Sequence, residues 1–169
     1  MAPLVRRTWA PQGQTPILRQ RGRSHHKVSV IAALVVSPHG RRVRLFFRIH
    51  PGVAITAPLI RDFLCQISLH LRGRSVIIWD RLNVHRAGVV TRYLATNPKV
   101  SVEYFPPYAP ELNPVEYVWG YLKTNPLANR PELDVDALTI STRHHTRCLQ
   151  NQARLLRSFL YKSSLFSPT

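Results

Sequence analysis

The chain has 169 residues, with 24 Lys and Arg against 8 Asp and Glu, so its formal net charge is +16 at pH 7. A chain of this length favours one domain that buries about two thirds of the surface its unfolded state exposes. No apolar run reaches the roughly 20 residues that span a bilayer, which excludes a membrane-spanning helix and favours a soluble, cytoplasmic protein. The positive charge favours polyanions as partners, with affinity that falls as salt rises. The plain alternative is a solvated basic surface that binds nothing specific.

The first fifty positions hold ten Lys and Arg and no acid. Residues 1–27 are rich in Arg, Pro, Gly and Gln and predict a basic arm or short hairpin. Residues 27–37 are almost continuously apolar and β-branched, which predicts a central strand covered on both faces. Residues 41–50 alternate apolar and basic side chains, which predicts a half-exposed strand. Its arginines either guard a sheet edge or meet phosphates, and the pattern leaves both roles open.

The remaining chain alternates helical and strand patterns. We expect a helix over residues 56–71 that ends in a basic turn capped by Gly73, and then strand 75–80, helix 86–95, strand 100–105 and helix 114–123. The order β-β-α-β-α-β-α indicates an α/β layered sheet. Apolar periodicity also predicts a helix from about residue 133 toward 149 and another around residues 155–160, both packing on the core. Cys65 and Cys148 lack metal-ligand spacing and are interpreted as small buried hydrophobic residues in a reducing environment.

Two carboxylates stand where strands end or helices begin. Asp80 follows four apolar residues, and Glu116 is the third residue of a helix that Asn113 and Pro114 open. Convergent carboxylates hold the Mg²⁺ ions that activate phosphodiesters. Each residue also has a structural alternative: Asp80 accepts backbone N–H bonds in the following turn, or Glu116 closes a capping box worth about 1 kcal/mol.

Four motifs resemble those of Tc1/mariner transposases, in particular the bacterial insertion-sequence branch. They are RRTWAPQGQTP from position 6, GRSHHKVSVIAAL from 22, VIIWDRLNVH from 76 and PPYAPELNPVEYVWGYLK from 106. The resemblance implies a ribonuclease-H-like (integrase/transposase) mixed sheet flanked by helices. It also implies Mg²⁺ or Mn²⁺ held by three acids, of which the second and third match Asp80 and Glu116. The first acid has no match, because no acid precedes Asp62, which fits a helix away from the site. We therefore expect the fold to lack its first strand.

The resemblance implies a DDE-type domain for DNA strand cleavage and transfer in transposition, inactive alone because the first acid is absent. The alternatives are a non-catalytic basic nucleic-acid-binding fragment and a subunit completed by an upstream reading frame. DNA is the expected partner, together with a second copy in a homodimer or an upstream-encoded half. The candidate phosphate contacts are Arg6, Arg7, Lys27, His85 and Lys123, although for His85 a supporting hydrogen bond fits better than direct contact.

We expect three parts in the chain: residues 1–27 as a basic arm or hairpin remnant, 28–125 as the catalytic core, and 126–169 as C-terminal helices packed on that core.

Overall fold

A computed structural model of the chain describes residues 10–14, 27–128 and 134–165. Most of the arm expected over residues 1–27 lies outside this range, and the described part forms a turn in which Gln14 N donates to Pro11 O. The described elements are β1 (Val28–Val36), β2 (Val43–Pro51), α1 (Ala57–Ser68), β3 (Ser75–Trp79), α2 (Gly88–Ala95), β4 (Val100–Tyr104), a short 3-10 helix η1 (Pro110–Leu112), α3 (Pro114–Thr124), α4 (Val135–Gln150) and α5 (Ala153–Lys162). The predicted order of strands and helices is confirmed.

The hairpin of β1 and β2 forms the middle layer of the molecule. The two strands pair antiparallel from Val28 opposite Pro51 to Val36 opposite Val43. Because successive side chains of a strand point to opposite faces, β1 contributes to two separate cores. One face carries Ala32, Leu34 and Val36 and the other carries Ile31, Ala33 and Val35. The prediction that both faces of this strand are covered is confirmed.

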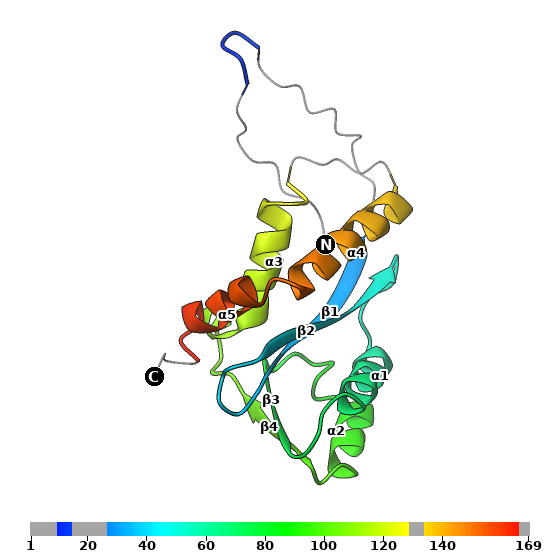
Figure 1. The fold of residues 1–169 in the computed structure, drawn as a ribbon. Helices are drawn as coiled ribbons and strands as arrows, with labels where there is room; N and C mark the ends of the chain where they lie inside the picture. The colour runs from blue at the N-terminus through cyan, green and yellow to red at the C-terminus, as the bar shows by residue number, and fades with distance from the viewer. Residues whose placement is uncertain (1–9, 15–26, 129–133, 166–169) are drawn as a thin grey trace.

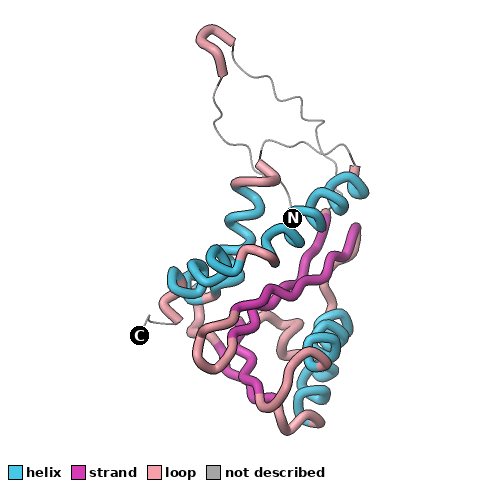
Figure 2. Tube along the Cα trace, viewed as in Figure 1, coloured by secondary structure: helices cyan, strands magenta, loops and turns pink. Residues whose placement is uncertain are grey.

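Helices cover both faces of this hairpin (Figures 1 and 2). On one face, buried side chains of α3, α4 and α5 join Val43 and Leu45 of β2 in a core that includes Val118, Leu122, Leu149, Leu156 and Phe159. Gln150 Nε2 donates to Leu45 O at 2.7 Å, and an Arg157 guanidinium N–H donates to Arg41 O at 2.9 Å. These bonds fasten α4 and α5 to the hairpin.

The other face packs on α1 and α2. Ile60, Phe63 and Ile67 of α1 and Val90 of α2 are buried here, and Trp79 at the end of β3 packs against them. The strands β3 and β4 run parallel, with Ser75 opposite Val100 and Trp79 opposite Tyr104. Within the described residues the strands form two separate two-stranded sheets, β1-β2 and β3-β4. Among the described strands, β1 therefore has β2 as its one neighbour, whereas a central strand has two.

Two local predictions are wrong. The helix expected over residues 56–71, with Gly73 as its cap, ends at Ser68. After Ser68 the chain continues in turns, in which His70 N donates to Ile67 O and Leu71 N donates to Ser68 O. Gly73 has a φ angle of +88° in the turn before β3, a conformation that favours glycine. The turn therefore accounts for the glycine at this position, and no helix cap is needed. Cys148, expected to be buried, is exposed on α4, and Cys65 is half-buried. None of the helices in the described ranges is long and apolar enough to cross a membrane.

Candidate active site

Asp80 lies directly after β3, in the loop that leads to α2. Its carboxylate Oδ1 accepts a hydrogen bond from Leu82 N at 3.2 Å, the bond expected of an Asp that stabilises its own turn. The same oxygen lies 2.8 Å from His85 Nδ1, and the Asp80 side chain is 45% exposed. Both contacts therefore use Oδ1, while nearly half of the Asp80 side chain remains exposed to solvent and accessible to a ligand.

His85 is held in place from two sides. Its ring stacks on the Trp79 indole with 4.3 Å between centroids and 3° between planes. Its Nδ1 also lies 3.3 Å from Asp80 O, and His85 N donates to Leu82 O at 2.9 Å. With only 15% of its side chain exposed, His85 is placed to orient the Asp80 carboxylate, which is the supporting role that fits its position in the motif.

Glu116 stands in the first turn of α3 without the capping box that the sequence allowed. Asn113 caps the helix by accepting from Val115 N at 3.1 Å, and the Asn113 N–H donates to Pro110 O. The N–H group that a capping-box glutamate would bind is thus already used. The Glu116 side chain is exposed and makes no hydrogen bond or ion pair with another described residue. Its carboxylate stays available for a ligand.

Three of the five candidate phosphate contacts, Lys27, His85 and Lys123, lie within the described residues. Arg6 and Arg7 are outside the described residues. Lys27 is exposed at the start of β1, where its carbonyl accepts from Gly52 N. Lys123 lies near the end of α3, against a hollow beside β1. Neither lysine belongs to an ion pair among the described residues, where the pairs are Arg61 with Asp62 and His85 with Asp80.

The donor atoms partly fit a divalent metal. Carboxylate oxygens are the ligands that Mg²⁺ prefers, and water completes its octahedral shell. Asp80 and Glu116 supply carboxylates of this type. Over residues 10–14, 27–128 and 134–165, however, no three His, Cys, Asp or Glu side chains gather in one cluster. Asp62 does not add a third acid here, because it sits on α1 and pairs with Arg61 at 2.6 Å.

This layered α/β structure, with an acid after a parallel strand and another at the start of the helix that follows the next strand, is the frame of ribonuclease-H-like transposase domains. A sequence model of the family described as DDE superfamily endonuclease matches residues 2–139, and the chain belongs to that family. The membership of the DDE superfamily that the motif resemblance implied is confirmed.

The structure is similar to that of Mos1. The match to the Mos1 mariner paired-end complex with Mn has a TM-score of 0.64 and 15% identity, and covers 96% of this chain and 50% of that one. The match to the Mos1 paired-end complex with the left transposon end has a TM-score of 0.66 and 15% identity, and covers 96% and 48%. The chain thus spans about half the length of the Mos1 chains. At this identity the likeness shows the fold, and it confirms the predicted ribonuclease-H-like class.

A relative is much more similar in sequence. The uncharacterized protein y4pE/y4sA of Sinorhizobium fredii (strain NBRC 101917 / NGR234) is 39% identical over 92 residues, which cover 50% of this chain and 65% of that protein.

Two features of the site were not found from the sequence. The stacking of His85 on Trp79 joins residues six positions apart across a turn, and no short-range pattern encodes a ring contact of that kind. The hollow that Trp119 and Lys123 share with β1 joins a strand and a helix about ninety positions apart in the chain. Trp119 is partly buried and packs against the core of α3, α4 and α5.

Proposed function

We propose that this chain is the catalytic domain of a DDE-type transposase, in which Asp80 and Glu116 bind Mg²⁺ or Mn²⁺ for cleavage and transfer of DNA strands. The proposal is supported most by the family match over residues 2–139, because that match includes both carboxylates in their motifs. The open carboxylate of Glu116 and the half-exposed carboxylate of Asp80 are consistent with it.

The residues around the two acids have distinct roles in this proposal. His85 and the Leu82 N–H hold the Asp80 carboxylate in one orientation. Asn113 caps α3, which leaves the Glu116 carboxylate free of a capping role. A bound divalent metal would supply charge stabilisation at phosphorus and an activated nucleophile. The two carboxylates would hold it, and the protein would keep them oriented while DNA approaches.

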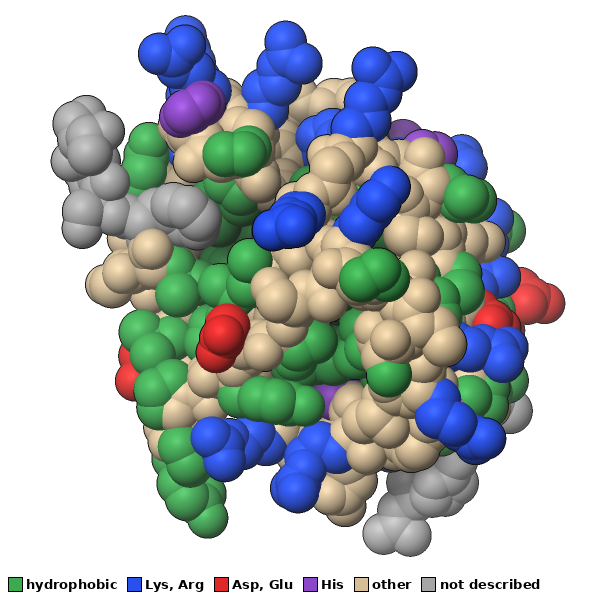
Figure 3. All heavy atoms as spheres, turned by 90° about the horizontal axis from the view of Figure 1, so that it is seen from below, with side chains coloured by type: hydrophobic (Ala, Val, Ile, Leu, Met, Phe, Trp, Pro, Cys, Tyr) green, Lys and Arg blue, Asp and Glu red, His purple; other side chains and the backbone are tan. Residues whose placement is uncertain are grey.

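DNA is the proposed polyanion. The net charge of +16 favours it, and the face of the molecule in Figure 3 carries many Lys and Arg side chains around an apolar middle, with few acids among them. The Mos1 structures similar to this chain are paired-end and strand-transfer complexes. Lys27, Arg6 and Arg7 are the proposed phosphate contacts, and pairing of DNA ends would need a second copy of the chain or another transposase part.

A second candidate function is DNA binding without turnover. It is favoured by the number of candidate metal ligands, since the described residues contain no cluster of three His, Cys, Asp or Glu side chains around Asp80 or Glu116. Loss of one member of a coupled catalytic group often costs several orders of magnitude in rate. We therefore expect negligible strand cleavage from this polypeptide alone.

The test is a nicking and binding assay with purified chain on supercoiled plasmid and on short duplex DNA, with Mn²⁺. We expect salt-sensitive binding and no nicking above the level of Asp80→Ala. Metal-dependent nicking that Asp80→Ala abolishes would show the chain to be active by itself. Absence of DNA binding at low salt would contradict both candidate functions. Metal-induced stabilisation of the wild type that Asp80→Ala removes would favour the transposase site over simple binding.

A further inference from the structure

A histidine and a cysteine meet on the outer face of α4. Residues four positions apart on a helix lie on the same face, one turn apart, and His144 and Cys148 have this spacing. Cys148 Sγ lies 3.7 Å from His144 Nε2. The buried side of α4 is formed by other residues, among them Thr142, Thr146 and Leu149. Both members of the pair are therefore exposed to solvent.

The distance between the two atoms fits one shared metal ion. In tetrahedral sites a zinc ion binds Cys sulfur at about 2.3 Å and His nitrogen at about 2.0 to 2.1 Å. At the tetrahedral angle these bond lengths place sulfur and nitrogen about 3.6 Å apart, which is close to the 3.7 Å between Cys148 Sγ and His144 Nε2. Without an ion, the contact is a weak hydrogen bond with one proton between the two atoms. An ion can replace that proton with little movement of either side chain.

Sulfur and imidazole nitrogen select the class of ion. Thiolate and imidazole suit soft and borderline cations such as Zn²⁺, whereas Mg²⁺ and Mn²⁺ suit oxygen ligands. The pair on α4 therefore differs in kind from Asp80 and Glu116, which offer carboxylate oxygens. It also differs in place from Asp80, because α4 packs on one face of the β1-β2 hairpin, and Trp79, the residue before Asp80, packs with α1 and α2 on the other (Figure 1).

We propose that His144 Nε2 and Cys148 Sγ bind one divalent cation of the Zn²⁺ type, separate from the metal proposed at Asp80 and Glu116. As the metal–sulfur bond forms, the thiol proton of Cys148 passes to solvent, and the imidazole binds in its neutral form. No electron is transferred. Two ligands four positions apart on a helix are an arrangement that other zinc sites use.

Water completes the coordination shell in this proposal. Over residues 10–14, 27–128 and 134–165 no third His, Cys, Asp or Glu side chain joins the pair in a cluster. The neighbouring His145 ring lies edge-on to the His144 ring, with 5.0 Å between centroids and 78° between planes. A site with two protein ligands and open positions exchanges its ion readily, so the ion is a reversible ligand and not a structural one.

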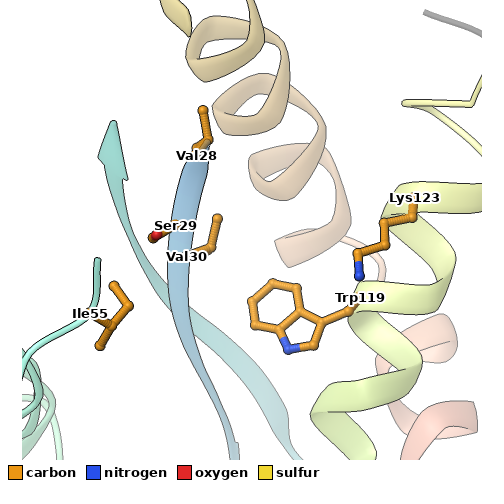
Figure 4. Close-up of a pocket in the computed structure, with 6 residues that line it drawn as sticks. All are labelled: Val28, Ser29, Val30, Ile55, Trp119 and Lys123. Carbon is orange, nitrogen blue, oxygen red and sulfur yellow. The ribbon is translucent and has the colours of Figure 1, made fainter. Parts of the chain in front are cut away.

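Other parts of the molecule offer weaker competition for such an ion. The hollow beside β1 in Figure 4 has no His, Cys, Asp or Glu among its six lining residues, and its charged group is Lys123, which repels cations. The second cysteine, Cys65, is half-buried on α1. The pair of His85 and Asp80 can also bind Zn²⁺, so the test must detect the metal–sulfur bond itself.

Titration of the full-length, reduced chain with Cd²⁺ provides that test, because a Cd²⁺–thiolate bond absorbs ultraviolet light and bonds to carboxylate do not. We expect the absorption to appear and to saturate near one ion per chain. Loss of only an outer partner of a metal ligand commonly costs about 10- to 100-fold in affinity, so His144→Ala should weaken binding at least about tenfold. Cys148→Ser should abolish the absorption. The matched controls, His39→Ala at an exposed turn and Cys65→Ser, should keep both.

Thiol alkylation gives a second measurement. Zn²⁺ should slow the reaction of Cys148 with iodoacetamide, followed by mass spectrometry of peptides, and Mg²⁺ should not. Asp80→Ala should keep this protection, so failure of the proposed transposase site is distinguishable from failure of the site on α4. The proposal is overturned if Cd²⁺ gives no thiolate absorption, if His144→Ala binds Cd²⁺ as tightly as the wild type, or if the absorption survives in Cys148→Ser.

Discussion

His85 Nδ1 lies 2.8 Å from Asp80 Oδ1 while the His85 ring stacks on Trp79, the residue that ends β3. The strand thus positions the imidazole, and the imidazole positions the carboxylate that follows the strand. The Leu82 N–H bond to the same oxygen fixes the carboxylate from a second direction. A flexible surface aspartate would lose conformational freedom on binding a metal, whereas this one is already ordered before any ligand arrives.

Replacement of His85 by Ala should therefore weaken both the fold and the site. Loss of the stacked ring is expected to lower the free energy of unfolding by about 1 kcal/mol, measured by urea denaturation. The increase in melting temperature on adding Mn²⁺ should shrink, because the Asp80 carboxylate is no longer held. His39→Ala, at an exposed turn, should change neither quantity. An unchanged Mn²⁺ response in His85→Ala would mean that the imidazole does not orient the carboxylate.

Glu116→Gln should separate metal binding from helix stability. The Glu116 carboxylate makes no capping bond, so we expect a change in unfolding free energy within about 0.5 kcal/mol, together with loss of the stabilisation by Mn²⁺. Glu111→Gln, at an exposed acid on η1, is the matched control and should keep the Mn²⁺ response.

The cap itself is tested by Asn113→Ala. This change removes the bond that Val115 N donates and should cost about 1 kcal/mol of stability. If Glu116→Gln costs as much as Asn113→Ala, the glutamate has a structural role that the observed contacts do not show.

How far the sequence predicted this molecule depends on the range of each interaction. Strands and helices followed from short periodic patterns, so β1, β3 and α3 were predicted within one or two residues. The end of α1 was missed because the apolar pattern continues to Leu71, which packs on the core from a turn whose hydrogen bonds span three residues and not the four of an α-helix. The exposure of Cys148 was missed because its neighbours Leu149 and Thr146 supply the buried face of α4 instead. The sheet division and the hollow beside β1 depend on contacts between distant segments, which no local pattern encodes.

The proposed DNA contact of Lys27 should appear in the salt dependence of binding. We expect the observed binding constant of the wild type to fall steeply with salt, and Lys27→Gln to reduce the slope of log K against log salt by about 1. The matched control is Arg61→Gln, because Arg61 already pairs with Asp62 at 2.6 Å. Equal slopes for wild type and Lys27→Gln would remove Lys27 from the interface.

His50 should give the fold a measurable sensitivity to acid. Burial, and then the charge of Arg48, lower the pKa of the His50 imidazole, and its Nε2 is buried without a hydrogen-bond partner in the described structure. In the unfolded chain the pKa returns to about 6.5, so the unfolded state binds more protons below that pH. Stability should therefore be full above about pH 6.5 and fall as the pH decreases toward the lowered pKa of the folded state.

The substitution His50→Gln removes this titration. Between pH 7.5 and 5.5 the wild type should lose more unfolding free energy than the variant, measured by urea denaturation at each pH. His39→Gln, where the imidazole is exposed, should follow the wild type. Parallel losses in wild type and His50→Gln would show that other groups carry the acid sensitivity, and that the imidazole gains enough hydration in the folded chain to accept a proton.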